Sequence, residues 1–124
     1  MTISSIGTTL TQHIMEKQRE HITATGEFSE LLAQIAVAGK VISAEVNKAG
    51  LADILGLTGS TNIQGESVQK LDQFANLVMI EQLTRSGQVC IMASEENDDV
   101  IVLPDGRRTG KYSVAFDPLD GSSN

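Results

Sequence analysis

The chain has 124 residues, with nine Lys and Arg against 16 Asp and Glu, a net charge of −7, and only three Phe and one Tyr as aromatic residues. This balance excludes proteins that bind nucleic acids or anionic membrane surfaces, because both classes need clustered basic side chains. Hydrophobic residues make up 40% of the chain and are spread along its whole length, which is enough for one globular domain.

Cysteine usage and hydropathy predict a reducing compartment. Cys90 is the single cysteine, so the chain cannot form an internal disulfide or a cysteine-based zinc site. The chain has no apolar run of the length that a membrane span needs, and its charged N-terminal residues lack the apolar centre of a secretory leader. We therefore expect a cytoplasmic protein without membrane or nucleic-acid partners.

The N-terminal part of the chain predicts two helices. Ile6, Leu10 and Ile14 recur every four residues, which indicates an amphipathic helix over residues 5–21. A second helix is expected to begin after Thr25, which can cap it, and to end at Gly50. Its apolar side chains are expected to be buried: Phe28, Leu31, Leu32, Ile35, Ile42 and Val46.

A change of hydrophobic period near Gly87 predicts a switch from helix to strand. A connector rich in small polar residues is expected at 59–65, followed by a third helix from about residue 67 to residue 86. Short runs of branched and aromatic residues then predict strands at 89–93, 100–103 and 112–116. The expected fold is therefore an α/β (α+β layered) arrangement, with N-terminal helices packed on a β-sheet.

Acidic residues concentrate near the end of the sequence, where seven of the 16 lie between Glu95 and Asp120. Glu95 and Glu96 follow one predicted strand and Asp117 follows another, so their carboxylates would project from strand ends, where α/β sheets usually hold ligands. Pro118 stops the strand, and the turn can bring Asp120 towards Asp117. Oxygen ligands of this kind suit Mg²⁺ or Mn²⁺, and several carboxylates indicate two or more ions that assist phosphate hydrolysis.

Other polar residues have simpler interpretations. Asp98 and Asp99 are typical of solvated turns. Cys90 lies inside a predicted strand and is expected in the core, not as a nucleophile. His13 and His21 lie on the polar face of the first helix, and we expect both to be solvated.

Residues 117–124, DPLDGSSN, resemble the metal and substrate loop of class I fructose-1,6-bisphosphatases, within the lithium-sensitive phosphatase superfamily. Further segments match this family in its order and spacing: ATGE at 24–27, NKAGL at 47–51, QKLDQFAN at 69–76, ASEE at 93–96 and GKY at 110–112. NIQGE at 62–66 resembles the bacterial branch. The DPxDG pattern by itself would also fit inositol monophosphatase-like enzymes.

The resemblance implies Mg²⁺-dependent hydrolysis of the 1-phosphate of fructose 1,6-bisphosphate to fructose 6-phosphate and phosphate, a step of gluconeogenesis. It also implies a homotetramer with AMP as an allosteric inhibitor. Residues 1–124 would be the N-terminal part of the fructose-1,6-bisphosphatase domain, truncated after Asn124, inactive alone, and an incomplete part of the sugar phosphatase fold. Two alternatives stay open: an inositol-monophosphatase-like enzyme, or a non-catalytic truncated chain that binds metal or AMP.

The same resemblance implies roles for individual residues. The metal ligands would be Glu95, Asp117, Asp120, Glu66 and the carbonyl of Leu119. The catalytic carboxylates would be Asp72 and Glu96, which activate the attacking water, and Glu66, which would meet a further ion with Glu95. The substrate would contact Asp120, Gly121, Ser122, Ser123 and Asn124. The AMP site would contain Thr25, Gly26, Glu27, Lys111 and Tyr112, where a helix N-terminus and a lysine suit a phosphate.

Overall fold

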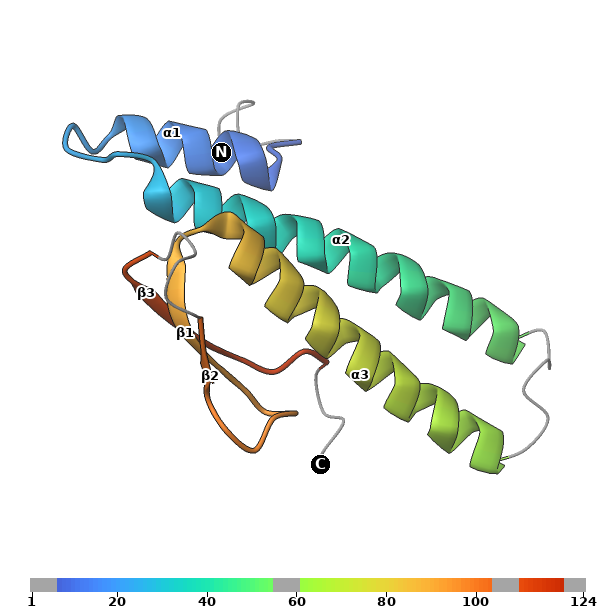
Figure 1. Cartoon of the computed structure of the whole chain (residues 1–124). Coiled ribbons are helices and arrows are strands. Elements are labelled where there is room, and N and C mark those ends of the chain that lie inside the picture. The colour runs from blue at the N-terminus through green and yellow to red at the C-terminus, as the bar shows by residue number, and fades with distance from the viewer. Residues whose placement is uncertain (1–6, 55–60, 104–109, 120–124) are drawn as a thin grey trace.

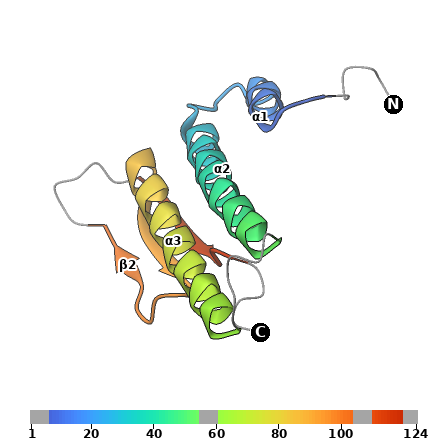
Figure 2. The same cartoon turned by 90° about the vertical axis from the view of Figure 1, so that its right-hand side faces the viewer.

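The computed structural model describes residues 7–54, 61–103 and 110–119, with side chains described outside residues 50–69. The elements of this part are α1 (Leu10–Arg19), α2 (Glu27–Ile54), α3 (Thr61–Ser86), β1 (Val89–Ser94), β2 (Ile101–Val102) and β3 (Tyr112–Phe116). In Figures 1 and 2, α2 and α3 run alongside each other, α1 lies against α2, and the strands lie beside α3. The predicted order of helices followed by a sheet is confirmed.

The hydrophobic core forms where α2 and α3 meet the sheet. Its buried members are Leu31, Leu83, Val89, Met92 and Leu103, and half-buried side chains from both layers surround them. Burying one such side chain stabilises a protein by about 1.5–3 kcal/mol. The core therefore fixes the C-terminal half of α3 against β1.

The sheet has the order β2-β1-β3, with β1 antiparallel to β2 and parallel to β3. Its pairing shifts between Val89 and Ile91, and then runs regularly to the last pair, Ser94 with Phe116. Cys90 lies at this shift, between Val89 and Ile91. It is half-buried, and its thiol donates to the carbonyl of Tyr112 at 3.4 Å. Because β1 and β3 are parallel, their carboxyl ends meet at one edge of the sheet.

The helix ends differ from those predicted. The second helix continues past Gly50 to Ile54, and α3 already begins at Thr61, so residues 61–65 are helical and not part of a connector. A glycine inside a helix costs about 1 kcal/mol relative to alanine, and the packing of α2 against α3 offsets this cost. The first helix is shorter than predicted, because Thr9 and Gln12 form a capping box in front of Leu10.

The burial predicted for the helices is partly wrong. Leu31 is buried as expected, but Phe28 and Val46 are 55% and 38% exposed. In the first helix, predicted only to be amphipathic, Ile14 is buried and Leu10 is 55% exposed. The exposed side chains lie on faces of α1 and α2 that the other described elements leave uncovered.

In the described part of the chain, no helix is long and apolar enough to cross a membrane.

Candidate functional site

The parallel pairing of β1 with β3 places two acidic residues at adjacent strand ends. Ser94 and Phe116 are register partners and are the last residues of their strands. Glu95 and Asp117 follow directly, and the N–H of Glu95 donates to the carbonyl of Phe116 at 3.1 Å. Both acidic residues are exposed, so an ion from solvent can reach this edge of the sheet.

The turn after β1 is held by hydrogen bonds to Ser94. The N–H of Asn97 donates to the carbonyl of Ser94 at 3.1 Å, and the N–H of Glu96 donates to its Oγ at 3.2 Å. Ser94 is only 6% exposed, and its Oγ donates to Oδ1 of Asn76 on α3 at 2.5 Å. These hydrogen bonds connect the turn with Glu95 and Glu96, which we call the acidic turn, to α3, the helix that carries Asp72.

Asp72 lies four residues before Asn76 on α3, so the two side chains share the helix face that meets the end of β1. Oδ1 of Asp72 is buried and has no hydrogen-bond partner within the described residues. A buried carboxylate oxygen needs a donor or a cation to offset the loss of its hydration. A bound water or a divalent ion fits this oxygen chemically, and Asp72, Glu95, Glu96 and Asp117 supply the oxygen ligands that Mg²⁺ and Mn²⁺ prefer.

The rest of the predicted metal and substrate set falls largely outside the described residues. Asp120 and residues 121–124 lie there entirely, as does the side chain of Glu66, whose backbone belongs to α3. Leu119 is half-buried after the end of β3. Among the described side chains, no group of three or more His, Cys, Asp or Glu is placed to hold a metal ion.

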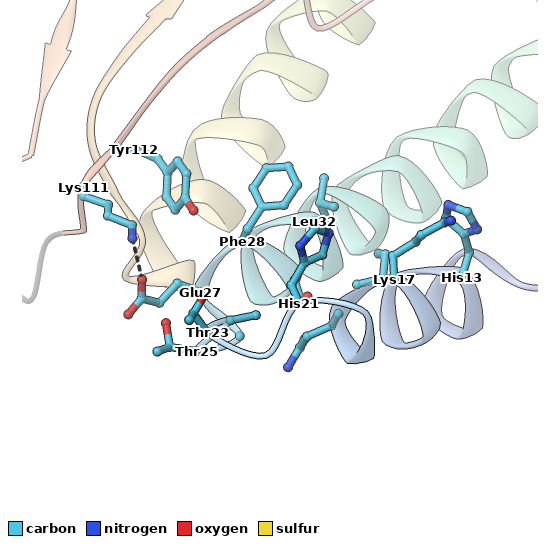
Figure 3. Close-up of a pocket in the computed structure, with 15 residues that line it drawn as sticks. His13, Lys17, His21, Thr23, Thr25, Glu27, Phe28, Leu32, Lys111 and Tyr112 are labelled. Carbon is cyan, nitrogen blue, oxygen red and sulfur yellow. Dashed lines mark ion pairs between the residues drawn. The ribbon is translucent and has the colours of Figure 1, made fainter.

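A cavity of about 470 Å³ lies between α1, the start of α2 and the start of β3 (Figure 3). The five residues predicted for the AMP site all line it: Thr25, Gly26, Glu27, Lys111 and Tyr112. Two segments that are far apart in the sequence therefore form one concave surface.

The charges in this cavity are paired. Nζ of Lys111 lies 3.0 Å from Oε2 of Glu27 and 5.7 Å from the ring centroid of Tyr112. The hydrogen bond and the negative charge of Glu27 raise the pKa of Lys111 above its ordinary value. The lysine is therefore cationic at neutral pH, and an anionic ligand would compete with Glu27 for it.

The first turn of α2 adds backbone donors and an aromatic surface. The carbonyl of Gly26 accepts the first helical bond from Glu30 at 2.9 Å, so Gly26 holds the N-cap position predicted for Thr25. Gly26 has φ 88°, which favours glycine. Phe28, wrongly predicted in the core, lines the cavity with its ring centroid 5.8 Å from that of Tyr112. Backbone N–H groups at the start of a helix, beside two rings, suit a flat, anionic ligand.

Sequence reasoning missed the wall of the cavity that α1 contributes. His13, Lys17 and Gln18 of α1 line it together with His21, which follows the helix. The four-residue spacing of His13, Lys17 and His21 could have indicated a basic face. Whether that face borders a cavity depends on how α1 packs on α2, which the spacing does not determine. Both histidines are exposed, as predicted.

Known proteins show similarity over almost the whole chain. The family model described as "Fructose-1-6-bisphosphatase, N-terminal domain" matches residues 8–124. The class 1 fructose-1,6-bisphosphatase of Maridesulfovibrio salexigens is 52% identical over 116 residues, which cover 94% of this chain and 34% of that protein. The class 1 enzyme of Nitratidesulfovibrio vulgaris is 53% identical, with the same coverage.

The fold is also similar to a solved structure. The fructose-1,6-bisphosphatase of Leishmania major in holo form aligns with a TM-score of 0.72 and 36% identity, over 94% of this chain and 33% of that one. The chain thus spans about a third of the length of the curated relatives it matches (34%). With a family match over residues 8–124 and a matching fold, the chain belongs to the fructose-1,6-bisphosphatase family and carries its N-terminal domain.

Proposed function

We propose that the full-length protein hydrolyses the 1-phosphate of fructose 1,6-bisphosphate to fructose 6-phosphate and phosphate, with Mg²⁺ or Mn²⁺ as cofactor. The observation that carries the proposal is the position of Glu95 beside Asp117, at the adjacent carboxyl ends of β1 and β3. The substrate is supported by the name of the similar curated proteins, fructose-1,6-bisphosphatase class 1. Homotetramer formation and a cytoplasmic location belong to the same proposal.

The proposal gives each part of the site a task. Glu95, Asp117, Asp120 and the carbonyl of Leu119 would hold metal ions, and Glu66 would join Glu95 at a further ion. Divalent ions bound there would neutralise phosphate charge and lower the pKa of a bound water.

Two further carboxylates would orient the attacking water and accept its proton. These are Asp72, whose Oδ1 is buried without a hydrogen-bond partner within the described residues, and Glu96 in the turn after β1. Residues 121–124 would hold the 1-phosphate through backbone N–H groups and hydroxyls.

Phosphate release from two substrates tests the proposal. The full-length protein should release phosphate from fructose 1,6-bisphosphate in the presence of Mg²⁺, and much more slowly from inositol monophosphate. A preference for inositol monophosphate would contradict the proposal and favour the related inositol phosphatases. Release from neither substrate would favour a non-catalytic chain that binds metal or nucleotide.

We also propose that the cavity between α1, α2 and β3 binds AMP as an allosteric inhibitor. The N-terminal N–H groups of α2 and the charge of Lys111 suit its phosphate, while Phe28 and Tyr112 offer rings against which the adenine can pack. Saturable AMP binding, measured by calorimetry on the full-length protein, should weaken when Tyr112 is replaced by alanine. Unchanged binding would place the nucleotide elsewhere.

A further inference from the structure

A short chain of side-chain hydrogen bonds joins α3 to the turn after β1, and we call it the Asn76 clasp. Oγ of Ser94 donates to Oδ1 of Asn76 at 2.5 Å, and Nδ2 of Asn76 donates to Oδ1 of Asn97 at 2.7 Å. Asn76 thus uses the acceptor and the donor of its amide at the same time. Its two partners are Ser94 and Asn97, the residues that stand immediately before and after Glu95 and Glu96.

The clasp fixes the backbone from which both carboxylates extend. Ser94 is 6% exposed and its Oγ also accepts the N–H of Glu96 at 3.2 Å, so the hydroxyl links the helix to the turn. On the opposite side, the N–H of Glu95 donates to the carbonyl of Phe116 at 3.1 Å. The turn is therefore held by α3 through side chains and by β3 through its backbone.

Asn76 also links the helix that carries Asp72 to the turn that carries Glu95 and Glu96. Asp72 lies one helical turn before Asn76 on the same face of α3. Any shift of α3 against the turn after β1 would move Asp72 relative to Glu95 and Glu96. Metal sites lose about 10–100-fold in affinity or activity when residues that orient their ligands are changed.

We propose that Asn76 is a positioning residue that acts through Ser94 and Asn97 to hold the metal ligand Glu95, and with it Glu96, in place relative to Asp72. This inference rests on the proposed function, since it assumes that the acidic turn binds divalent ions. It goes beyond that function because Asn76 itself is neither a ligand nor a catalytic residue.

Mn²⁺ binding to the full-length protein, without substrate, tests the clasp directly. The variants Asn76→Ala and Ser94→Ala should each bind Mn²⁺ about tenfold more weakly than the unmodified protein. The loss in the double variant should be smaller than the sum of the two single losses, because both substitutions remove the hydrogen bond between Ser94 and Asn76, while each also removes one further bond. Gln73→Ala, at an exposed position of α3, is the matched control and should bind Mn²⁺ normally.

Three binding results would overturn the proposal. Unchanged Mn²⁺ affinity in Asn76→Ala would show that the clasp only stabilises the fold, even if the thermal unfolding temperature falls. Additive losses in the double variant would show that Asn76 and Ser94 act separately. Absence of saturable Mn²⁺ binding by the unmodified protein would overturn it as well.

Turnover separates this proposal from the proposed function. With fructose 1,6-bisphosphate, Asn76→Ala should need about tenfold more Mg²⁺ for half-maximal activity and show a lower kcat, with KM for the sugar phosphate within about twofold. If the unmodified protein releases no phosphate, the proposed function fails, and Mn²⁺ binding alone decides the role of Asn76. A change confined to KM would contradict positioning of the metal ligands.

Discussion

Glu95 and Asp117 occupy equivalent positions after two parallel strands, and each offers one carboxylate to the proposed metal site. Replacing either by its amide, Glu95→Gln or Asp117→Asn, keeps the shape and removes one negative charge. Changing a residue that only orients a ligand typically costs about 10–100-fold in activity. The activity of the full-length protein should fall by more than this in either variant. Excess Mg²⁺ should restore only part of it, as measured by phosphate release over a Mg²⁺ titration.

Asp98 provides the matched control for these two substitutions. It is exposed, lies three residues after Glu95, and was predicted as a solvated turn residue. Asp98→Asn should therefore leave the Mg²⁺ dependence of activity unchanged. If Glu95→Gln behaved like Asp98→Asn, Glu95 would not be a metal ligand.

In the cavity proposed to bind AMP, the carboxylate of Glu27 pairs with Lys111 and would compete with the phosphate of the nucleotide for it. Glu27→Gln should free the lysine and tighten AMP binding by about two- to fivefold, the range expected for an exposed ion pair. Lys111→Ala should weaken AMP binding about tenfold or more and leave uninhibited turnover unchanged. Inhibition curves for both variants test this, and loss of basal activity in Lys111→Ala with AMP sensitivity intact would place the lysine in the active site or the sheet.

The pKa of Lys111 follows from the same pair. Because Glu27 raises this pKa in the folded state, the pair adds stability below the ordinary lysine pKa, and this contribution is lost as pH rises through the raised value. In Glu27→Gln, the pKa of Lys111 should move down towards its ordinary value. An NMR titration of the lysine ε-carbon measures the shift, and an unchanged pKa would mean that Glu27 is not its cause.

At the scale of elements, Gly110 sets how closely the start of β3 approaches the residue before β1. A Cβ at position 110 would overlap the backbone of Gln88, whose carbonyl accepts the N–H of Tyr112 at 3.0 Å. Gly110→Ala should therefore lower the free energy of unfolding by about 1–3 kcal/mol, the usual cost of overpacking. Urea denaturation of the full-length protein measures this loss.

Gly39 is the control glycine for this experiment. It lies on an exposed position of α2, and a Cβ there would meet nothing within 4 Å. Gly39→Ala should raise the free energy of unfolding by about 0.5–1 kcal/mol, because alanine is the better helix former. Equal effects at both positions would contradict the close approach at Gly110.

The elements themselves could be predicted from the sequence better than their ends. The 112–116 strand was predicted with its observed bounds, because alternating branched and aromatic residues follow the strand period. The end of α2 was wrong, since Gly50 alone looks like a stop signal while the packing of α2 on α3 decides the outcome. The position of Phe28 depends on where α1 packs, which no local pattern encodes.

In the candidate sites, too, some residues could be predicted from the sequence and others could not. Strand-end carboxylates such as Glu95 and Asp117 could be recognised because parallel strands place their ends together. The α1 wall of the cavity and the role of Asn76 could not, because both depend on contacts between segments that are far apart in the sequence. Local patterns therefore predict candidate ligands, whereas the contacts that position them depend on tertiary packing.

At the scale of the whole molecule, the chain covers only 34% of its curated relatives. Large apolar side chains are exposed in it, among them Leu77 and Val102, each 66% exposed. Residues 1–124 produced alone should therefore release no phosphate from fructose 1,6-bisphosphate, whereas we expect the full-length protein to release it. Turnover by residues 1–124 at the rate of the full-length protein would show that the remaining sequence adds nothing to the reaction.

Strand β3 joins the two proposed sites, since Tyr112 begins it and Asp117 follows its last residue. Five residues of parallel strand span about 17 Å, and β1 pairs with β3 along this length. Side chains alternate between the two faces of a strand, so inserting or deleting one residue would turn Asp117 away from Glu95. Substitutions in β3 are therefore tolerated where the new side chain still packs. The number of residues in β3, however, must stay constant if both proposed sites are to keep their geometry.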